Sequence, residues 1–295
     1  MSGPEYVPYN FGALPGEDSQ LEKSRLVILP VPYDSTATYR TGAKEGPLAI
    51  INASRNLELF DEELLCDVST QGIHTLPELM PEHSGPEHMI KTVEGVADQI
   101  LKQGKIPVTL GGEHSITLGP VRACKKIFPR LSVLQIDAHL DLRDSYAGTE
   151  YSHACVMRRV LETVAITQVA IRSFSEEEHD FVTKNNLKPF YQRDINHSKD
   201  WPDEVIKRLS GEVYVTVDLD GLDPSIMPSV GTPEPGGLGW YELLGLLRKL
   251  SEKRKIVGFD VMELRPEPDN VAPDFLAARL TYKLATYTLI SKKRG

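Results

Sequence analysis

The chain has few cysteines and no long apolar run. Its 295 residues include three Cys, an odd number without the C-x-x-C spacing of zinc or redox motifs. No stretch approaches the roughly 20 apolar residues of a transmembrane helix. The first residues lack the charged start and apolar middle of a signal peptide. We therefore expect a cytoplasmic protein with reduced thiols and no membrane partner.

An excess of basic residues is also missing. Lys and Arg number 33 against 42 Asp and Glu, which gives a formal net charge of −9. This balance, without any long basic block, argues against a nucleic-acid partner. It suits a cationic small molecule as ligand. Repeats and Gly/Ser linkers are absent, so the length allows one large α/β domain or two smaller ones.

Short apolar runs alternate with amphipathic stretches along most of the chain. Residues 1–24, rich in Pro, Gly and acidic residues, are expected to form an irregular N-terminal arm. The alternation that follows is typical of parallel βαβ units, and the apolar runs suit strands covered on both faces. We expect strands at 25–31, 105–110, 131–137, 168–173, 212–218 and 255–261, and helices at 87–103, 116–126, 152–164, 175–186, 202–210 and 240–253.

Acidic residues and histidines follow four of the expected strands. The strand KIPVTL runs into GGEHS, LSVLQI into DAHLD, EVYVTV into DLDGLDP, and KIVGF into DVMEL. Ligands of parallel sheets bind at the carboxyl ends of the strands. We therefore expect one site assembled from four distant segments.

The candidate site residues are typical metal ligands. In IDAHLD, Asp137, His139 and Asp141 occupy alternate positions, which point to the same side of an extended chain. Two imidazoles and four carboxylates without a thiolate favour Mn(II), with zinc, nickel or cobalt as alternatives. Six ligands are too many for one catalytic ion with an open position, and they suit two ions that share carboxylates. The candidate ligands are His114, Asp137, His139, Asp141, Asp218 and Asp220.

Each segment alone has an ordinary structural interpretation. GGEHS would serve as a strand-to-helix turn with Ser115 near the helix start. Asp218 and Asp220 would serve as carboxylates that cap turns. The occurrence of all six at corresponding strand ends favours the metal site.

These segments resemble the signatures of the ureohydrolase family, which includes arginases and agmatinases. The similar stretches are LGGEHSITLGPVRA, VLQIDAHLD and TVDLDGLDPSIMPSVGTPEPGG, with further matches at YSHACVMRR and FDVMEL. The likeness implies a single domain over 25–295. It also implies a three-layer αβα sandwich around a mostly parallel sheet of about eight strands. Two manganese ions, hydrolysis of a guanidino compound and a homotrimer or homohexamer are implied as well.

The resemblance also assigns roles to the candidate ligands. It implies that two aspartates bridge the ions while the other four residues each hold one ion. In this scheme Asp137 and Asp218 bridge, His114 and Asp141 complete the first set, and His139 and Asp220 complete the second.

Further roles concern the substrate and its protons. The resemblance implies that Glu263 grips the guanidinium and that Thr232 lines the same pocket. It implies that His153 shuttles protons with a pKa near the working pH, and that Asp220 passes a proton to the leaving amine. The expected catalytic residues are thus His153, Asp220 and Glu263.

Several positions depart from the family pattern. Glu113 stands where many members have Asp. This difference is expected to alter the surroundings of a metal ligand, while the ligands themselves are retained. The segment SHAC replaces the more usual His-Gly, so that Ala154 and Cys155 follow His153. These two residues are expected to alter the pocket wall. Arg265 is expected to change the pocket rim or an interface.

The loop LRDSYAGTEY, residues 142–151, bears on the substrate. It lacks the Asn/Ser-rich pattern by which arginine-specific members hold an α-amino acid. Asp144 and Glu150 are instead expected to bind an amine-bearing tail. Agmatine, yielding putrescine and urea, is the leading substrate, and aminopropylagmatine, on a route to spermidine, is the alternative.

Other interpretations remain open at this point. Guanidinobutyrate, arginine, a formimino compound or guanidine would keep the chemistry and change the substrate. A metal-dependent deacetylase on a related scaffold would need one essential ion. A non-catalytic paralogue would typically have lost ligands, whereas this chain retains all six and Glu263.

Overall fold

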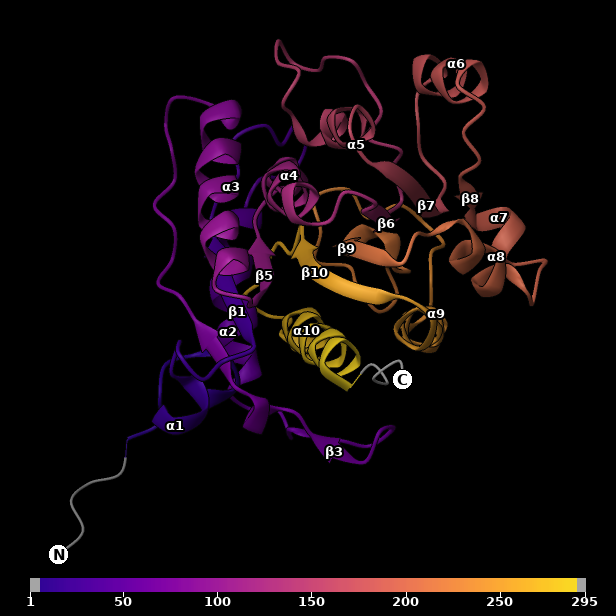
Figure 1. The fold of residues 1–295 in the computed structure, drawn as a ribbon. Coiled ribbons are helices and arrows are strands. Elements are labelled where there is room, and N and C mark those ends of the chain that lie inside the picture. The colour runs from indigo at the N-terminus through magenta and orange to yellow at the C-terminus, as the bar shows by residue number, and fades with distance from the viewer. Residues whose placement is uncertain (1–5, 291–295) are drawn as a thin grey trace, which may run out of the picture.

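The computed structural model describes residues 6–290 and contains an eight-stranded sheet between layers of helices (Figure 1). The strand order is β4-β1-β5-β10-β9-β6-β7-β8, and every pairing is parallel. This arrangement confirms the expected αβα fold class. The strands are β1 Leu26–Val31, β4 Ile73–Thr75, β5 Ile106–Gly111, β6 Ser132–Ile136, β7 Ala165–Ile171, β8 Phe190–Tyr191, β9 Glu212–Asp218 and β10 Lys255–Met262.

Six of these strands correspond to the expected ones. The edge strands β4 and β8 have three and two residues, too few to produce a recognisable pattern. A separate antiparallel hairpin pairs β2 (Phe60–Asp61) with β3 (Cys66–Asp67).

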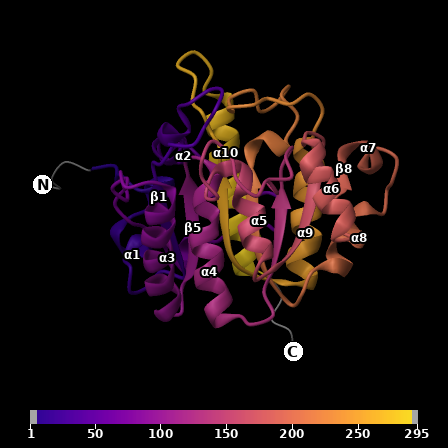
Figure 2. The ribbon, with the colours of Figure 1, turned by 90° about the horizontal axis from the view of Figure 1, so that it is seen from above.

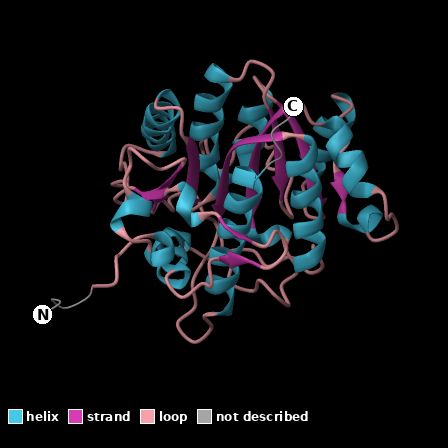
Figure 3. Ribbon diagram, turned by 60° about the horizontal axis from the view of Figure 1, so that its bottom comes forward, coloured by secondary structure: helices cyan, strands magenta, loops and turns pink. Residues whose placement is uncertain are grey.

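Helices cover both faces of the sheet (Figures 2 and 3). One layer contains α3 (Pro86–Lys102), α4 (Leu118–Ile127), α5 (Val156–Leu161) and the peripheral α6 (Glu176–Lys184). The other contains α2 (Gly46–Ser54), α8 (Trp201–Arg208), α9 (Trp240–Lys253) and α10 (Ala272–Ile290), with the short α7 (Gln192–Ile195) at the same edge.

The near-continuous apolar strands result from this double covering. Val213, Val215 and Val217 of β9 pack into the core under α9 and α10, whereas Tyr214 packs into the core under α4 and α5. Successive side chains of a strand point to opposite faces, so both sets must be apolar.

The register brings the central strand ends level. Ile136 of β6 pairs with Val217 of β9, and Val217 pairs with Val261 of β10. Val261 in turn pairs with Leu110 of β5. The residues that follow β5, β10, β9 and β6 therefore emerge side by side at one edge of the sheet.

The N-terminal segment packs on its own chain from residue 6 onward. Phe11 and Leu14 are buried, and the Phe11 amide donates to Thr75 Oγ1 at 3.0 Å. Its regular structure consists of a 3-10 turn at Phe11–Ala13 and the four-residue α1 (Gly16–Ser19). Residues 6–24 are otherwise irregular, and residues 1–5 lie outside the described part of the chain. The expected N-terminal arm over 1–24 stays a prediction.

The three cysteines are free thiols. Cys124 and Cys155 are buried and Cys66 is half-buried. Within residues 6–290, no helix combines the length and apolarity that crossing a membrane would require.

Helix α10 holds the β2–β3 hairpin through a buried cation. The side chain of Lys283 is 2% exposed, and its Nζ lies 3.0 Å from both Asp61 Oδ2 and Glu62 Oε1. The Tyr287 hydroxyl donates to Glu63 in the same hairpin. Because Asp61 is itself 1% exposed, its charge depends on this lysine.

Replacing Lys283 by Met should therefore destabilise the fold. Lys283→Met keeps the side-chain length but leaves the Asp61 charge buried and unpaired. We expect a loss of about 3 kcal/mol in the free energy of unfolding, measured by denaturant titration. Lys249→Met removes an exposed pair with Asp203 and should change little. Equal unfolding midpoints for the two variants would contradict this role of Lys283.

Candidate active site

A cavity of about 310 Å³ opens at the level ends of the central strands. Side chains from all four segments expected to form the site line it, together with residues of the loops after β1 and β7. The lining includes His114, His139, Asp141, His153, Asp218, Asp220, Thr232 and Glu263.

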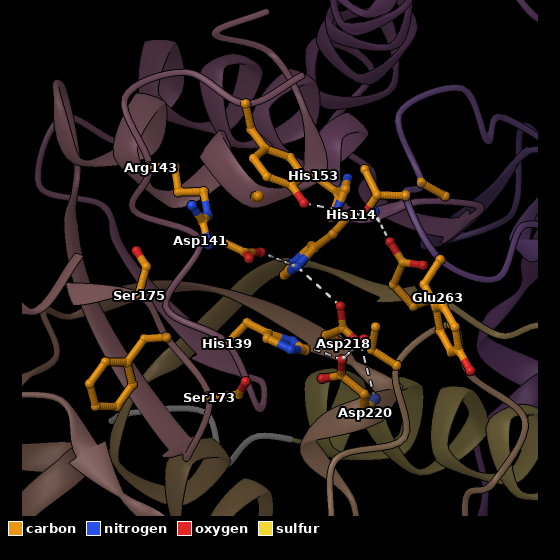
Figure 4. Close-up of a pocket in the computed structure, with 18 of the residues that line it drawn as sticks. His114, His139, Asp141, Arg143, His153, Ser173, Ser175, Asp218, Asp220 and Glu263 are labelled. Carbon is orange, nitrogen blue, oxygen red and sulfur yellow. Dashed lines mark hydrogen bonds and ion pairs between the residues drawn. The ribbon is translucent and has the colours of Figure 1, made fainter. Parts of the chain in front are cut away.

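Three carboxylates converge on one nitrogen of His114. Asp137 Oδ2 lies 3.1 Å from His114 Nδ1. Asp141 Oδ2 lies 3.1 Å and Asp218 Oδ2 3.3 Å from the same nitrogen (Figure 4). His114 and Asp137 are almost fully buried. The Nδ1 atom nevertheless has no hydrogen-bond partner of good geometry. One imidazole proton cannot satisfy three carboxylates, so this arrangement suits a cation placed among the four side chains.

The pKa values in this group show the same electrostatic conflict. Burial raises the pKa of Asp141 to about 7, with the charge of Asp137 adding to the effect. Burial also raises the pKa of Asp218 well above its usual value, helped by Asp220 and Asp137. A bound cation would favour the ionised forms of these carboxyls.

Residues behind His114 fix the orientation of its ring. Its Nε2 lies 2.8 Å from Thr216 Oγ1 on β9. Thr216 in turn hydrogen-bonds to Asp260 on β10, a buried carboxyl that also accepts from the Tyr214 hydroxyl at 2.9 Å. With Nε2 engaged, the Nδ1 lone pair is directed at the carboxylates, as metal-binding histidines require.

A second ligand group adjoins the first. The Nδ1 atom of His139 lies 3.0 Å from Asp220 Oδ2 and 3.5 Å from Asp137 Oδ1. In each of the groups His114–Asp137–Asp218 and Asp137–His139–Asp220, the ligand atoms lie within 4.8 Å of one another. Asp137 belongs to both, with one carboxylate oxygen facing each. Its Oδ1 also accepts the His139 backbone N–H at 2.6 Å, and its expected bridging role stays a prediction.

The placement of Asp218 is less symmetrical. Its Oδ2 faces His114, whereas its Oδ1 accepts the backbone N–H of Asp220 at 2.9 Å. The bridging role of Asp218 therefore stays a prediction.

The expected substrate-contacting residues share the cavity with the ligand groups. The carboxylate of Glu263 accepts the His114 amide at 2.6 Å, and Thr232 Oγ1 lies 3.3 Å from Asp220 Oδ2. Asp141 and Glu263 both have left-handed backbone, with φ of 53° and 68°. Non-glycine residues rarely adopt this conformation, and such strain can be retained where it positions functional groups.

The protonation of His153 differs from the expectation. Burial, reinforced by the nearby His139 and His114 rings, lowers the pKa of His153 to about 4. Its imidazole is therefore neutral at neutral pH and does not titrate near it.

The two acids expected to bind the substrate tail do not line the cavity. Asp144 Oδ1 lies 2.7 Å from Arg159 Nη2, and Glu150 Oε2 lies 3.6 Å from Arg159 Nη1. Their carboxylates are thus neutralised on α5, outside the pocket lining. Sequence proximity to the ligand loop was misleading because α5 follows that loop and supplies the arginine.

The structure places each departure from the family pattern. Glu113 is buried and binds the loop after β1, not the ligand groups. Ala154 lines the cavity, as expected, whereas Cys155 is buried behind it. Arg265 is not part of the cavity lining, and its Nε donates to the Thr41 carbonyl at 2.9 Å.

Two polar residues of the site were missed in the sequence. Glu178 lines the cavity, and its Oε1 accepts the Leu142 amide at 3.0 Å. Arg172 donates to the carbonyl oxygens of Asp220 and Glu234 at 2.6 and 2.9 Å. Glu178 forms a capping box with Ser175, so its spacing indicated only a helix start.

Known proteins share this fold and these segments. A sequence profile described as the arginase family matches residues 24–286. An N(1)-aminopropylagmatine ureohydrolase from Synechocystis is 41% identical over 271 residues, covering 89% of this chain and 88% of its own length. An agmatinase from Pyrococcus horikoshii is 34% identical, with 87% and 89% covered.

A solved structure agrees with these sequence comparisons. The agmatine ureohydrolase of Thermoplasma volcanium superimposes with a TM-score of 0.86 at 37% identity, covering 96% of this chain and 95% of the other. The resemblance seen in the sequence is thereby confirmed. With the ligand-bearing strand ends in place and the family profile matched over nearly its whole length, this chain belongs to the arginase family of hydrolases, which act on guanidino compounds.

Proposed function

We propose that this chain is a two-manganese ureohydrolase of N1-aminopropylagmatine, with agmatine as the second candidate substrate. The observation that carries the proposal is the convergence of two ligand groups, joined by Asp137, in one cavity with the carboxylate of Glu263. Water would add to the guanidinium carbon and the bond to the alkyl nitrogen would break. The products would be urea and an amine.

The donor set fits a pair of divalent ions. His114, Asp141 and Asp218 would hold one ion and His139 and Asp220 the other, with Asp137 shared. Nitrogen and carboxylate donors without sulfur suit Mn(II). When bound, such a pair lowers the pKa of water toward about 7 and so supplies a nucleophile at neutral pH.

Glu263 would hold and orient the substrate. A carboxylate can accept two parallel hydrogen bonds from the planar guanidinium, which fixes the direction of its carbon. In Figure 4, Glu263 lies on one side of the His114 group, and Arg143, Ser173 and Ser175 lie on the other. An extended substrate gripped at Glu263 could therefore pass its tail toward Ser175 and Glu178.

Proton movement would involve Asp220 and His153. Asp220 adjoins the ligand groups and could carry a proton from the attacking water to the departing amine. His153 lines the same cavity and, being neutral, can accept a proton and return it.

The relatives and the pocket together favour a polyamine-like tail. The Synechocystis relative is named for aminopropylagmatine, and the Pyrococcus and Thermoplasma proteins are named for agmatine. Glu178 is an acid of the pocket lining, although its carboxylate already accepts from Leu142 and Ser175 and lies 3.9 Å from Arg143 Nε, so an ammonium would share it with these groups. The cationic Arg40, which could bind a substrate carboxylate, is already paired with Glu267 at 2.9 Å. A substrate without a carboxylate is therefore preferred.

As the family resemblance implies, we also propose a homotrimer or homohexamer. Light scattering on the purified protein would determine its mass in solution.

A substrate panel tests the proposed reaction. Mn-loaded protein should release urea from N1-aminopropylagmatine with the highest kcat/KM, followed by agmatine. Lower values are expected for guanidinobutyrate, arginine, a formimino compound and guanidine. Amine products should be detected alongside urea. A preference for arginine would refute the assigned substrate, and no urea from any compound would indicate a non-catalytic paralogue.

Removing the shared aspartate should disrupt both metal sites. Asp137→Ala is expected to reduce bound manganese from two ions per chain to at most one weakly held ion, measured by elemental analysis after dialysis. Asp144→Asn, which lies outside the cavity, should retain two. Two tightly bound ions in the Asp137 variant would rule out the bridge.

Neutralising Glu263 should affect the substrate and spare the metal. Glu263→Gln removes a charge-assisted contact, so we expect kcat/KM to fall about 10- to 100-fold. Manganese content should remain that of the unaltered protein. Unchanged turnover would show that the guanidinium is held elsewhere.

A further inference from the structure

We propose that Glu113 is a positioning residue that acts on His153 through Thr36 and fixes which nitrogen of that ring carries the proton. The inference rests on the proposed function for its catalytic meaning, because His153 is the proton carrier there. The hydrogen-bond arrangement itself follows from the positions of the side chains and does not depend on the proposed function.

Glu113 receives hydrogen bonds from four donors although it is fully buried. The backbone amides of Ser35 and Thr36 donate to its Oε2 at 2.7 and 2.5 Å. The hydroxyls of Thr36 and Ser115 donate to its Oε1 at 2.9 and 2.5 Å. Burial raises the pKa of Glu113, but the four donors oppose this and favour the ionised form. A carboxylate only accepts, so the Thr36 proton is committed to Glu113.

The same Thr36 oxygen contacts His153 twice. It accepts the His153 backbone N–H at 3.0 Å and lies 3.0 Å from the ring nitrogen Nδ1. Because the Thr36 proton points at Glu113, the hydroxyl can only accept from the ring. Nδ1 must therefore carry the proton, and the two lone pairs of Thr36 are both used.

This tautomer leaves the other ring nitrogen unprotonated. Within the described residues no hydrogen-bond partner engages His153 Nε2, and the ring lines the cavity. An unprotonated Nε2 can accept a proton directly, whereas an Nε2–H tautomer could not. The ring also makes an edge contact with Tyr146, with centroids 5.8 Å apart, which limits its rotation.

The fold holds the relay in place through the ends of two adjacent strands. The Glu113 amide donates to the Tyr33 carbonyl at 2.8 Å, joining the segments after β5 and β1. A side chain at Gly112 would place its Cβ 1.8 Å from that carbonyl oxygen, so only glycine allows this approach. Glu113 thus sits at a fixed distance from the Thr36 loop.

The decisive variant is Glu113→Gln. The two backbone amides can only donate, so they require the amide oxygen, and the new NH2 group must face Thr36 and Ser115. Thr36 would then accept from Gln and turn its own proton toward His153 Nδ1. The ring should change to the Nε2–H tautomer.

The tautomer can be measured without relying on activity. We suggest solid-state NMR of the full-length, chelator-treated protein labelled with ¹⁵N-histidine, with His153→Asn used to assign the signals. In the unaltered chain, the protonated His153 nitrogen should be Nδ1. In Glu113→Gln it should be Nε2. An unchanged tautomer in the variant would overturn the proposal.

Kinetics on the manganese-loaded enzyme provide a second arm. Thr36→Val should lower kcat about 10- to 100-fold, with little change in KM or bound manganese. Thr36→Ser should restore kcat because it restores the hydroxyl. Thr183→Val removes an exposed threonine hydroxyl on α6 that bonds only the His179 carbonyl, and it should behave as the unaltered enzyme. Equal kcat for Thr36→Val and the parent, or no rescue by serine, would refute the relay.

The two proposals fail differently. If the parent hydrolyses no guanidino compound, the proposed function falls, while the NMR comparison still decides whether Glu113 sets the tautomer.

Discussion

Mutual repulsion among buried carboxylates is the constraint on which the rest of this structure depends. Asp137, Asp141 and Asp218 place oxygens within 3.3 Å of one histidine nitrogen, at positions where water is almost excluded. Such a cluster is costly unless a cation compensates it. Gln135 donates to Asp137, and Thr216, which hydrogen-bonds to Asp260, holds the His114 ring. The presence of this supported cluster in a folded chain indicates that the fold is built around bound positive charge.

The parallel sheet makes that cluster possible. Four adjacent strands end level, so residues more than a hundred positions apart in the chain emerge within contact distance. Helices cover both faces, and the strand ends form the one edge where polar side chains can gather around a cavity. Loops after β1 and β7 then close the sides, the first held by Glu113 and the second by Arg172.

Substrate choice depends on charged residues other than the metal ligands. Asp144 and Glu150 are occupied by Arg159, and Arg40 is occupied by Glu267. Beyond the ligand groups the cavity presents two acids, Glu263 and Glu178, and Glu178 Oε2 lies 3.9 Å from Arg143 Nε. A charged residue in a nearby loop is available to a substrate only if no neighbouring side chain pairs with it.

The sequence by itself determined the alternation of strands and helices, the six candidate ligands and the family. Those features are local: apolar periodicity sets each strand, and the ligands occur within a few residues of strand ends. The short edge strands β4 and β8 were not predicted, because two or three residues are too few to show an apolar periodicity. Helix α10 was not among the expected helices, since it is buried on most sides and lacks an amphipathic stripe.

Only the tertiary structure decided how the charges pair and which protons are fixed. Arg159 neutralises the two acids expected to bind substrate, and burial makes His153 neutral at pH 7. Thr36 contacts His153 from a position 117 residues away in the chain, and Glu113 binds Thr36. Hydrogen bonding and burial depend on neighbours in space, which no local pattern specifies, so these properties could appear only once the chain was folded.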